Sequence, residues 1–264
     1  MHVSSLLRLT CALQYTYLVD SPFKQRGGFF LIAGPGNMKS ALVESSVKPF
    51  SNALCYSDLT LKQLAVLRSP IANGSYQTLG FLELEKLYAR QSSVAMNLEG
   101  VIKAMVEEGF SHFAFEDKRL WVPTARCYVI ASVLDSLYTL HGARWTDNGF
   151  LRRFLQFKYV LSFKAKEKVH HAVHVGELIE MPPMFPIPST PIKFDVTMQE
   201  SKHLADILGS DDMIFTPLNL LRKALVILKW VHRQTKNGKR LPTPMEYIDD
   251  LKDGLGKNGG SLDL

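Results

Sequence analysis

The stretch that decides the fold is "FFLIAGPGNMKSALVE", residues 29–44. An apolar run comes first, a turn rich in Gly and Pro follows, and an amphipathic segment begins at Lys39 and Ser40. That order predicts a buried strand, a loop and a helix. Phosphate-binding loops share this order, because backbone N–H groups, a lysine and a helix N-terminus then converge on the anion. A plain strand–turn–helix without a ligand is the alternative interpretation.

The loop departs from the usual phosphate-binding pattern at Ala33 and at Met38, two positions where glycine is usual. We expect Lys39 to reach the outer phosphates of ATP and the hydroxyl of Ser40 to bind Mg²⁺. The residues predicted to bind the nucleotide in this loop are Gly34, Pro35, Gly36, Asn37, Met38, Lys39 and Ser40.

A second apolar run, "LGFLELEK" (residues 79–86), ends in two glutamates. A magnesium–nucleotide site needs carboxylates at the tip of a nearby strand, one for the metal and one to activate water. Glu83 and Glu85 are two residues apart, so on a strand both would point the same way. The alternative is a pair of surface glutamates at the start of a helix.

Two adjacent arginines, Arg152 and Arg153, lie in "DNGFLRRFLQF" (residues 147–157). In some ring-forming ATPases an arginine enters the neighbouring subunit's site and stabilises charge in the transition state. A solvated basic turn is the alternative interpretation of this pair.

Together these motifs resemble the AAA+ ATPases, specifically the branch that holds the minichromosome-maintenance helicases and related phage or mobile-element ATPases. The resemblance spans residues 28–161 and implies a three-layer P-loop NTPase core with a parallel sheet. It also implies Mg²⁺–ATP as cofactor and a homo-oligomeric ring, with a hexamer as one form. Arg153 matches the branch's arginine finger. Two registers of the acidic motif remain open. Glu83 is the catalytic glutamate in one, whereas in the other Glu83 binds metal and Glu85 activates water.

Nucleic acid is the predicted partner. The segment "FSHFAFEDKRLWVPTA" (residues 110–125) predicts a hairpin with Lys118 and Arg119 at its tip, and the resemblance implies that this tip faces a central pore. Acidic residues are absent from position 213 to position 245. On a helical wheel the basic residues of this region fall on one stripe, which suits contact with nucleic-acid phosphates. A solvated basic face is the alternative, and DNA and RNA stay equally open. The stripe consists of Arg222, Lys229, Arg233, Lys236 and Arg240, of which Arg222 is also a candidate nucleotide contact from a lid.

Composition fits a globular protein of the reducing cytosol. The chain of 264 residues has a net charge of +6 and three widely spaced cysteines, and it shows neither a signal peptide nor an apolar run long enough to cross a membrane. His170, His171 and His174 lack a nearby carboxylate or thiolate, so no metal site is expected there. The predicted parts are an ATPase core (1–176), a Pro-rich linker (177–196), a helical C-terminal lid or nucleic-acid-binding unit (197–255) and a disordered tail (256–264).

The sequence therefore predicts an AAA+ motor that acts on nucleic acid, helicase-like or loader-like. The sequence departs from the AAA+ pattern at Ala33, Met38, Leu82 and Leu134. These departures weaken the prediction of ATP hydrolysis more than the prediction of nucleotide binding. A non-hydrolysing AAA+ scaffold that serves as an assembly or interaction protein is the alternative function.

Overall fold

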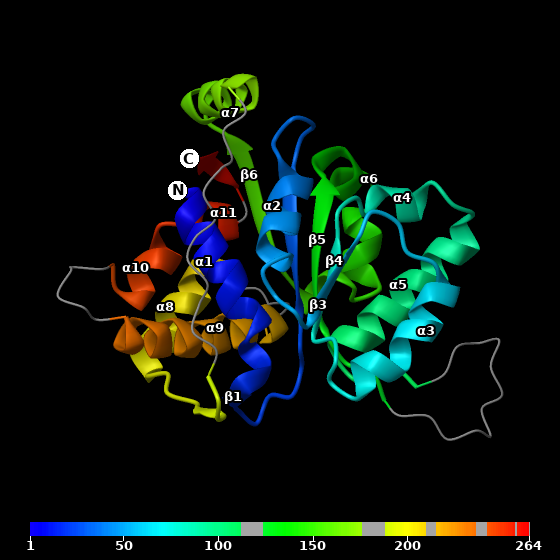
Figure 1. Ribbon diagram of the computed structural model, residues 1–264, viewed down its shortest axis with the longest axis horizontal. Coiled ribbons are helices and arrows are strands. Elements are labelled where there is room, and N and C mark those ends of the chain that lie inside the picture. The colour runs from blue at the N-terminus through cyan, green and yellow to red at the C-terminus, as the bar shows by residue number, and fades with distance from the viewer. Residues whose placement is uncertain (112–123, 176–187, 210–214, 236–241, 257, 264) are drawn as a thin grey trace.

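A computed structural model describes residues 1–111, 124–175, 188–209, 215–235, 242–256 and 258–263 (Figure 1). Within them a parallel sheet of six strands has the order β3-β4-β5-β2-β6-β8. Its strands are β2 (Gly28–Ala33), β3 (Ala53–Tyr56), β4 (Thr78–Phe81), β5 (Tyr128–Leu134), β6 (Phe154–Leu161) and β8 (Gly260–Leu262). Because the strands are parallel, their carboxyl ends meet at one edge of the sheet.

Strand β2 lies inside the sheet between β5 and β6, with Ala33 opposite Leu134 and Gly28 opposite Phe154. All of its residues are buried, as expected for a parallel strand that helices cover on both faces. Alternate side chains enter two separate clusters, Phe29 and Leu31 on one face and Phe30 and Ile32 on the other. The predicted α/β class with a parallel sheet is confirmed.

Helices pack against both faces of this sheet (Figure 1). The cluster around Phe29 is covered by α1 (Val3–Gln14), α2 (Lys39–Val47), α8 (Met198–Leu208), α9 (Phe215–Gln234), α10 (Pro244–Asp249) and α11 (Lys252–Leu255). The cluster around Phe30 is covered by α3 (Leu61–Ala72), α4 (Glu85–Tyr88), α5 (Ser92–Val106) and α6 (Asp135–Asp147). None of the helices within the described ranges is both long and apolar enough to cross a lipid bilayer.

Local sequence explains where several helices begin. Thr60, Thr197 and Thr243 each precede a helix and accept a hydrogen bond from the backbone N–H three residues later. A Gln or Glu side chain at that later position returns the bond to the threonine backbone. These capping boxes satisfy backbone donors that the first turn leaves unpaired, so they fix the starts of α3, α8 and α10.

The C-terminal helices share one hydrophobic cluster with α1 and β6. Residues that follow the Pro-rich segment join them through β7 (Ile192–Lys193), which pairs in parallel with β1 (Val19–Asp20). A short 3-10 helix, η1 (Thr16–Leu18), leads into β1, and a second one, η2 (Leu151–Arg153), leads into β6. After β6, helix α7 (Phe163–Val175) extends beyond the carboxyl edge of the sheet (Figure 1).

The prediction of a disordered tail is wrong for β8, which pairs with the free edge of β6. The backbone N–H of Val3 donates to the carbonyl oxygen of Asp263 at 2.7 Å, so both ends of the described chain are tied together. Leu262 is fully buried in the cluster around Phe29. Composition predicted disorder here because a short Gly-rich segment does not form stable structure by itself. In the structure, pairing with the open edge of β6 orders this segment.

Only the base of the predicted hairpin lies in the described part of the chain. Phe110 and Ala125 pair antiparallel and exchange two backbone hydrogen bonds of 3.0 and 2.8 Å. Ala125 lies shortly before β5 begins, so this base sits at the amino edge of the sheet. Lys118 and Arg119, the predicted tip, lie outside the described residues.

Candidate nucleotide-binding site

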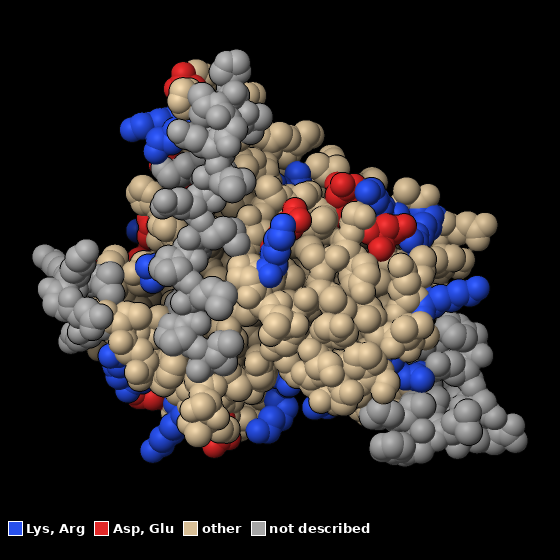
Figure 2. Space-filling model, in the orientation of Figure 1, with Lys and Arg blue, Asp and Glu red and all other residues tan. Residues whose placement is uncertain are grey.

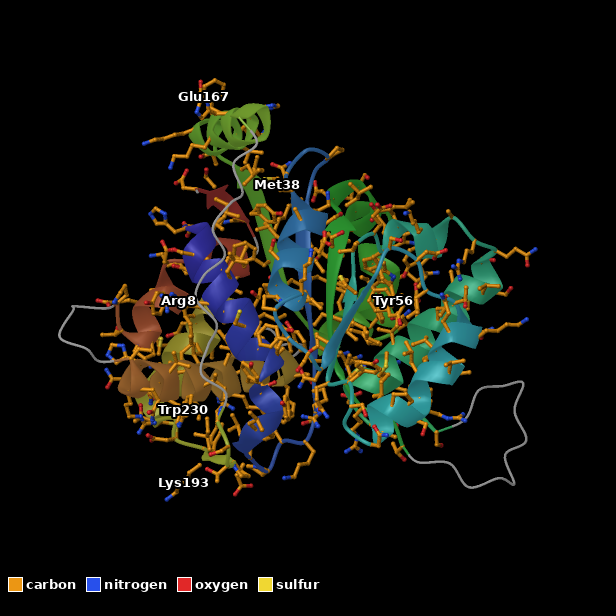
Figure 3. The ribbon with its side chains drawn as sticks, viewed as in Figure 1. Arg8, Met38, Tyr56, Glu167, Lys193 and Trp230 are labelled. Atoms are coloured by element: carbon orange, nitrogen blue, oxygen red, sulfur yellow. The ribbon has the colours of Figure 1, made fainter. Side chains whose placement is uncertain are left out.

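The loop between β2 and α2 holds an unusual backbone conformation. Met38 has φ 54° and ψ 23°, and it is the only residue other than glycine with positive φ in the part of the chain described. This left-handed region costs an L-residue with a side chain about 1–2 kcal/mol. Gly36 also has positive φ, at 71°. Helix α2 begins directly after Met38, at Lys39 (Figure 3).

Asn37 fixes this loop against strand β6. Its Oδ1 accepts from the backbone N–H of Leu161 at 2.8 Å, and its carbonyl oxygen accepts from the Tyr159 hydroxyl at 2.8 Å. Its Nδ2 donates to the carbonyl oxygens of Gly34 and Pro35, both at 3.1 Å. The sequence predicted Asn37 as one of the nucleotide-binding residues and gave it no partner within the chain. Its partners on β6 come about 120 residues later and give no local signal.

Lys39 lies inside the loop rather than on the surface. The residue is 8% exposed, and its Nζ donates to the carbonyl oxygen of Gly34 at 3.0 Å. Burial lowers the pKa of the Lys39 ammonium, and the negative charge of Glu85 partly opposes that shift. The Lys39 ammonium therefore interacts electrostatically with a glutamate at the start of helix α4.

The carbonyl oxygen of Leu82, just after β4, connects this strand to helix α2 and strand β5. It accepts from the Ser40 hydroxyl at 2.7 Å and from the buried Ser132 hydroxyl of β5. In the register that makes Glu83 catalytic, residue 82 takes the place of the metal-binding aspartate that the resemblance implies. Its leucine side chain is partly buried against the cluster around Phe29, so only its backbone carbonyl has a polar role in this contact.

The two glutamates have different environments, and the prediction that both point the same way from a strand is wrong. Strand β4 ends at Phe81, and Glu85 begins helix α4. Glu83 forms an ion pair with Lys86 at 2.9 Å and is 39% exposed. Glu85 instead has a buried Oε2 that makes no hydrogen bond in the described part of the chain. The carboxylate that interacts with Lys39 is therefore that of Glu85.

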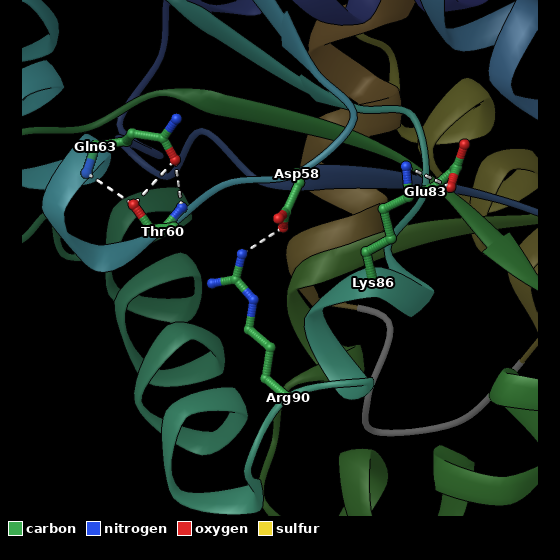
Figure 4. A network of polar contacts seen from close by, with 6 residues as sticks. All are labelled: Asp58, Thr60, Gln63, Glu83, Lys86 and Arg90. Atoms are coloured by element: carbon green, nitrogen blue, oxygen red, sulfur yellow. Dashed lines mark hydrogen bonds and ion pairs between the residues drawn. The ribbon is translucent and has the colours of Figure 1, made fainter.

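A second polar pair borders the glutamates. Asp58, which follows β3, forms an ion pair with Arg90, which follows α4, and the Lys86–Glu83 pair lies nearby (Figure 4). Charged side chains of both signs gather at the upper right of the face in Figure 2, where Figure 1 places α4. The sequence analysis missed Asp58 and Arg90, because neither belongs to a motif and only the fold brings them together.

Helix α4 is held from its far end by a buried carboxylate. Glu99 of α5 is 5% exposed, and its Oε1 accepts from the Tyr88 hydroxyl, from Arg144 and, at 3.0 Å, from the Trp145 Nε1. Because α4 is a single turn, this anchor at Tyr88 fixes the position of Glu85 at its start. Nothing in the local sequence indicated this cluster.

The arginine pair lies at the opposite edge of the sheet from the loop, since η2 precedes β6 and Phe154 pairs with Gly28 at the start of β2. Arg153 is largely buried. It forms an ion pair with Glu107 and donates to the carbonyl oxygen of Gly149. Arg152 is exposed and makes no hydrogen bond or ion pair among the described residues. The exposed arginine is therefore Arg152, although the resemblance favoured Arg153.

Arg222 does not reach the loop, so its predicted nucleotide contact is not supported. Its guanidinium donates to Asn219 and Ser201 within the C-terminal helices. The next residue, Lys223, donates to the carbonyl oxygens of Phe23 and Gln25. Those two residues precede β2, so this part of α9 lies at the amino edge of the sheet.

Only part of the predicted basic stripe lies among the described residues. Lys229 forms an ion pair with Glu200 at 2.8 Å and donates to the carbonyl oxygen of Asp195, so its charge is already balanced. Arg233 is exposed and donates to the carbonyl oxygen of Lys229. Lys236 and Arg240 lie outside the described residues.

Among the residues described, no three His, Cys, Asp or Glu side chains form a cluster that could hold a metal by themselves. A nucleotide-bound Mg²⁺ needs less, because phosphates and waters supply most of its ligands. The Ser40 hydroxyl fits that smaller demand. In comparisons with known proteins, no family model matches the chain and no curated protein shows a significant similarity.

Proposed function

We propose that the protein is a P-loop ATPase of the AAA+ type that binds Mg²⁺–ATP at the loop between β2 and α2. The observation that carries this proposal is the left-handed backbone at Met38, directly before Lys39 and the start of α2. Such a turn sits where a helix N-terminus and a lysine meet, and that combination favours a bound polyphosphate.

In this proposal Lys39 leaves the Gly34 carbonyl and pairs with the outer phosphates. The Ser40 hydroxyl would hold Mg²⁺, which would supply positive charge beside the phosphates when bound. Glu85 is the general base for the attacking water, because its Oε2 is unpartnered and its charge acts on Lys39. Glu83 is less suited, since its carboxylate is paired with Lys86.

Nucleotide affinity tests the loop directly. We expect Lys39→Ala to weaken the binding of a fluorescent ATP analogue at least tenfold, because the loop loses its lysine charge. Lys48→Ala is the matched control, since Lys48 is exposed at the other end of the same helix. Equal affinity in the wild type and both variants would place any nucleotide site elsewhere.

Turnover tests the carboxylates. We expect Glu85→Gln to retain ATP and lose hydrolysis, whereas Glu83→Gln loses only an exposed ion pair and keeps most activity. Full activity of Glu85→Gln would remove Glu85 from the mechanism. We further propose a homo-oligomer that works on nucleic acid, in which the exposed Arg152, rather than Arg153, reaches a neighbouring subunit. Concentration-dependent turnover that Arg152→Ala abolishes would support that assembly.

A non-hydrolysing scaffold is the second candidate function, and two contacts favour it. Glu83 and Arg153, which the resemblance places in the reaction, are both engaged within the chain. Nucleotide binding without turnover, at any protein concentration and with or without DNA or RNA, would establish the scaffold instead.

A further inference from the structure

A cleft away from the loop lies beside strand β6. Its volume is about 320 Å³, and β6, α6 and the C-terminal helices line it. The lining residues used below are Tyr138, Thr146, Arg152, Gln156, Leu208 and Leu255. The lining contains no residue of the loop between β2 and α2. Its volume lies at the lower end of the range of about 300–1,000 Å³ that is typical of small-molecule pockets.

The charge in the cleft is unbalanced and positive. Lys158 lines it too, but its Nζ is paired with Asp135 at 2.9 Å, so these two charges cancel. Arg152 makes no hydrogen bond or ion pair in the described part of the chain. One guanidinium is therefore left with its donors available, and a planar guanidinium suits a carboxylate or sulfonate.

A neutral donor accompanies that charge. The Tyr138 hydroxyl donates to the Oε1 of Gln156 at 2.6 Å, which fixes the orientation of this amide. The amide nitrogen of Gln156 makes no hydrogen bond within the described ranges, so it stays available as a donor. Leu208 and Leu255, with the backbone of residues 254–256, line the rest of the cleft and contribute apolar surface.

We infer that this cleft binds a small organic anion with an apolar body. The anionic group pairs with Arg152 and accepts from the Gln156 amide, and the apolar part lies against the C-terminal helices. Such a ligand would bridge the sheet and helices α8 and α11. This inference does not rest on the proposed nucleotide site, because the cleft shares no residue with the loop between β2 and α2. Arg152 alone also has a role in the proposed assembly, and probe binding tests its role in the cleft without any turnover.

The probe for this site is 8-anilinonaphthalene-1-sulfonate, which joins a sulfonate to an aromatic body. We expect the full-length wild type to bind it saturably, with enhanced fluorescence. Arg152→Gln should weaken the affinity about tenfold, the effect of losing one charge-assisted hydrogen bond. Arg233→Gln removes an exposed arginine of α9 that does not line the cleft, so it should leave the affinity unchanged.

A second variant blocks the cleft instead of removing its charge. Thr146 is partly exposed on α6, so Thr146→Trp can enter the cleft without disturbing the core, and it should remove saturable binding. Circular dichroism melts check that each variant folds. Unchanged affinity in Arg152→Gln, or the absence of saturable binding in the wild type, would overturn the inference. It would also be overturned if Lys39→Ala, but not Arg152→Gln, lost the probe.

Discussion

The strained backbone at Met38 gives the sharpest test of the loop geometry. We consider two substitutions, Met38→Gly and Met38→Ala, which both remove the partly buried side chain and so lose the same packing. They differ in the cost of the left-handed conformation. Alanine keeps that cost, about 1–2 kcal/mol, and glycine removes it.

Glycine also has a cost, because its unfolded chain is more flexible. At an ordinary position this makes glycine about 0.5–1 kcal/mol less stable than alanine. Subtracting the midpoint of that range, about 0.75 kcal/mol, from the midpoint of the relieved strain, about 1.5 kcal/mol, leaves Met38→Gly more stable than Met38→Ala by about 0.75 kcal/mol. At position 38 the glycine variant is thus expected to be more stable than the alanine variant, which reverses their order of stability at an ordinary position.

Urea denaturation followed by circular dichroism measures this difference, and the midpoint shift at constant slope reports it. Met38→Val serves as a third variant, since a β-branched residue is disfavoured still more at positive φ, and it should be the least stable of the three. If Met38→Ala proves more stable than Met38→Gly, residue 38 does not adopt the left-handed conformation in solution, and the argument for the phosphate-binding turn fails.

Three further predictions concern the surroundings of the site. Glu99→Gln should lower the free energy of unfolding by about 2 kcal/mol, because hydrogen bonds to a buried carboxylate are strong. Urea titration measures this loss, and Glu44→Gln, at an exposed position on α2, is the control. Burial lowers the pKa of Lys223 from its ordinary value of 10.5 to about 8. Between pH 8 and 10.5 the unfolded chain therefore binds more protons than the folded one, and stability should rise with pH. Lys223→Met should flatten that rise between pH 8 and 10, and an unchanged slope would contradict the shift. Leu262→Asp should detach β8 and reduce the amide-exchange protection of Ser162, whose N–H donates to the Leu262 carbonyl oxygen, whereas Ser261→Asp on the exposed side of β8 should not.

The local pattern predicted the core of this fold well. The apolar run at residues 29–33 is a buried strand, and the segment after Lys39 is a helix. These predictions succeed because a strand buried on both faces, or an amphipathic helix, must show its period in a few consecutive residues. The sequence also predicted the α/β class of the fold.

The candidate site was predicted only in part. The loop motif marked residues 34–40, but it gave no indication that Asn37 is held by β6 or that Leu82 joins Ser40 to Ser132. The pattern of Glu83 and Glu85 suggested a continuing strand, whereas the chain turns into α4 and separates the two carboxylates. Spacing alone shows that charges are near one another, and it cannot show which of them has a partner.

The sequence by itself determined the buried strand, the Gly-Pro turn and the lysine that follows it, because these depend on residues that are neighbours in the chain. Only the tertiary structure decided that Glu85 rather than Glu83 interacts with Lys39, that Arg153 is paired while Arg152 is exposed, and that residues 260–262 complete the sheet. The physical reason is that hydrogen bonds and ion pairs act over a few ångströms in space. The partners that satisfy them, or leave them free for a ligand, come from segments far apart in the chain.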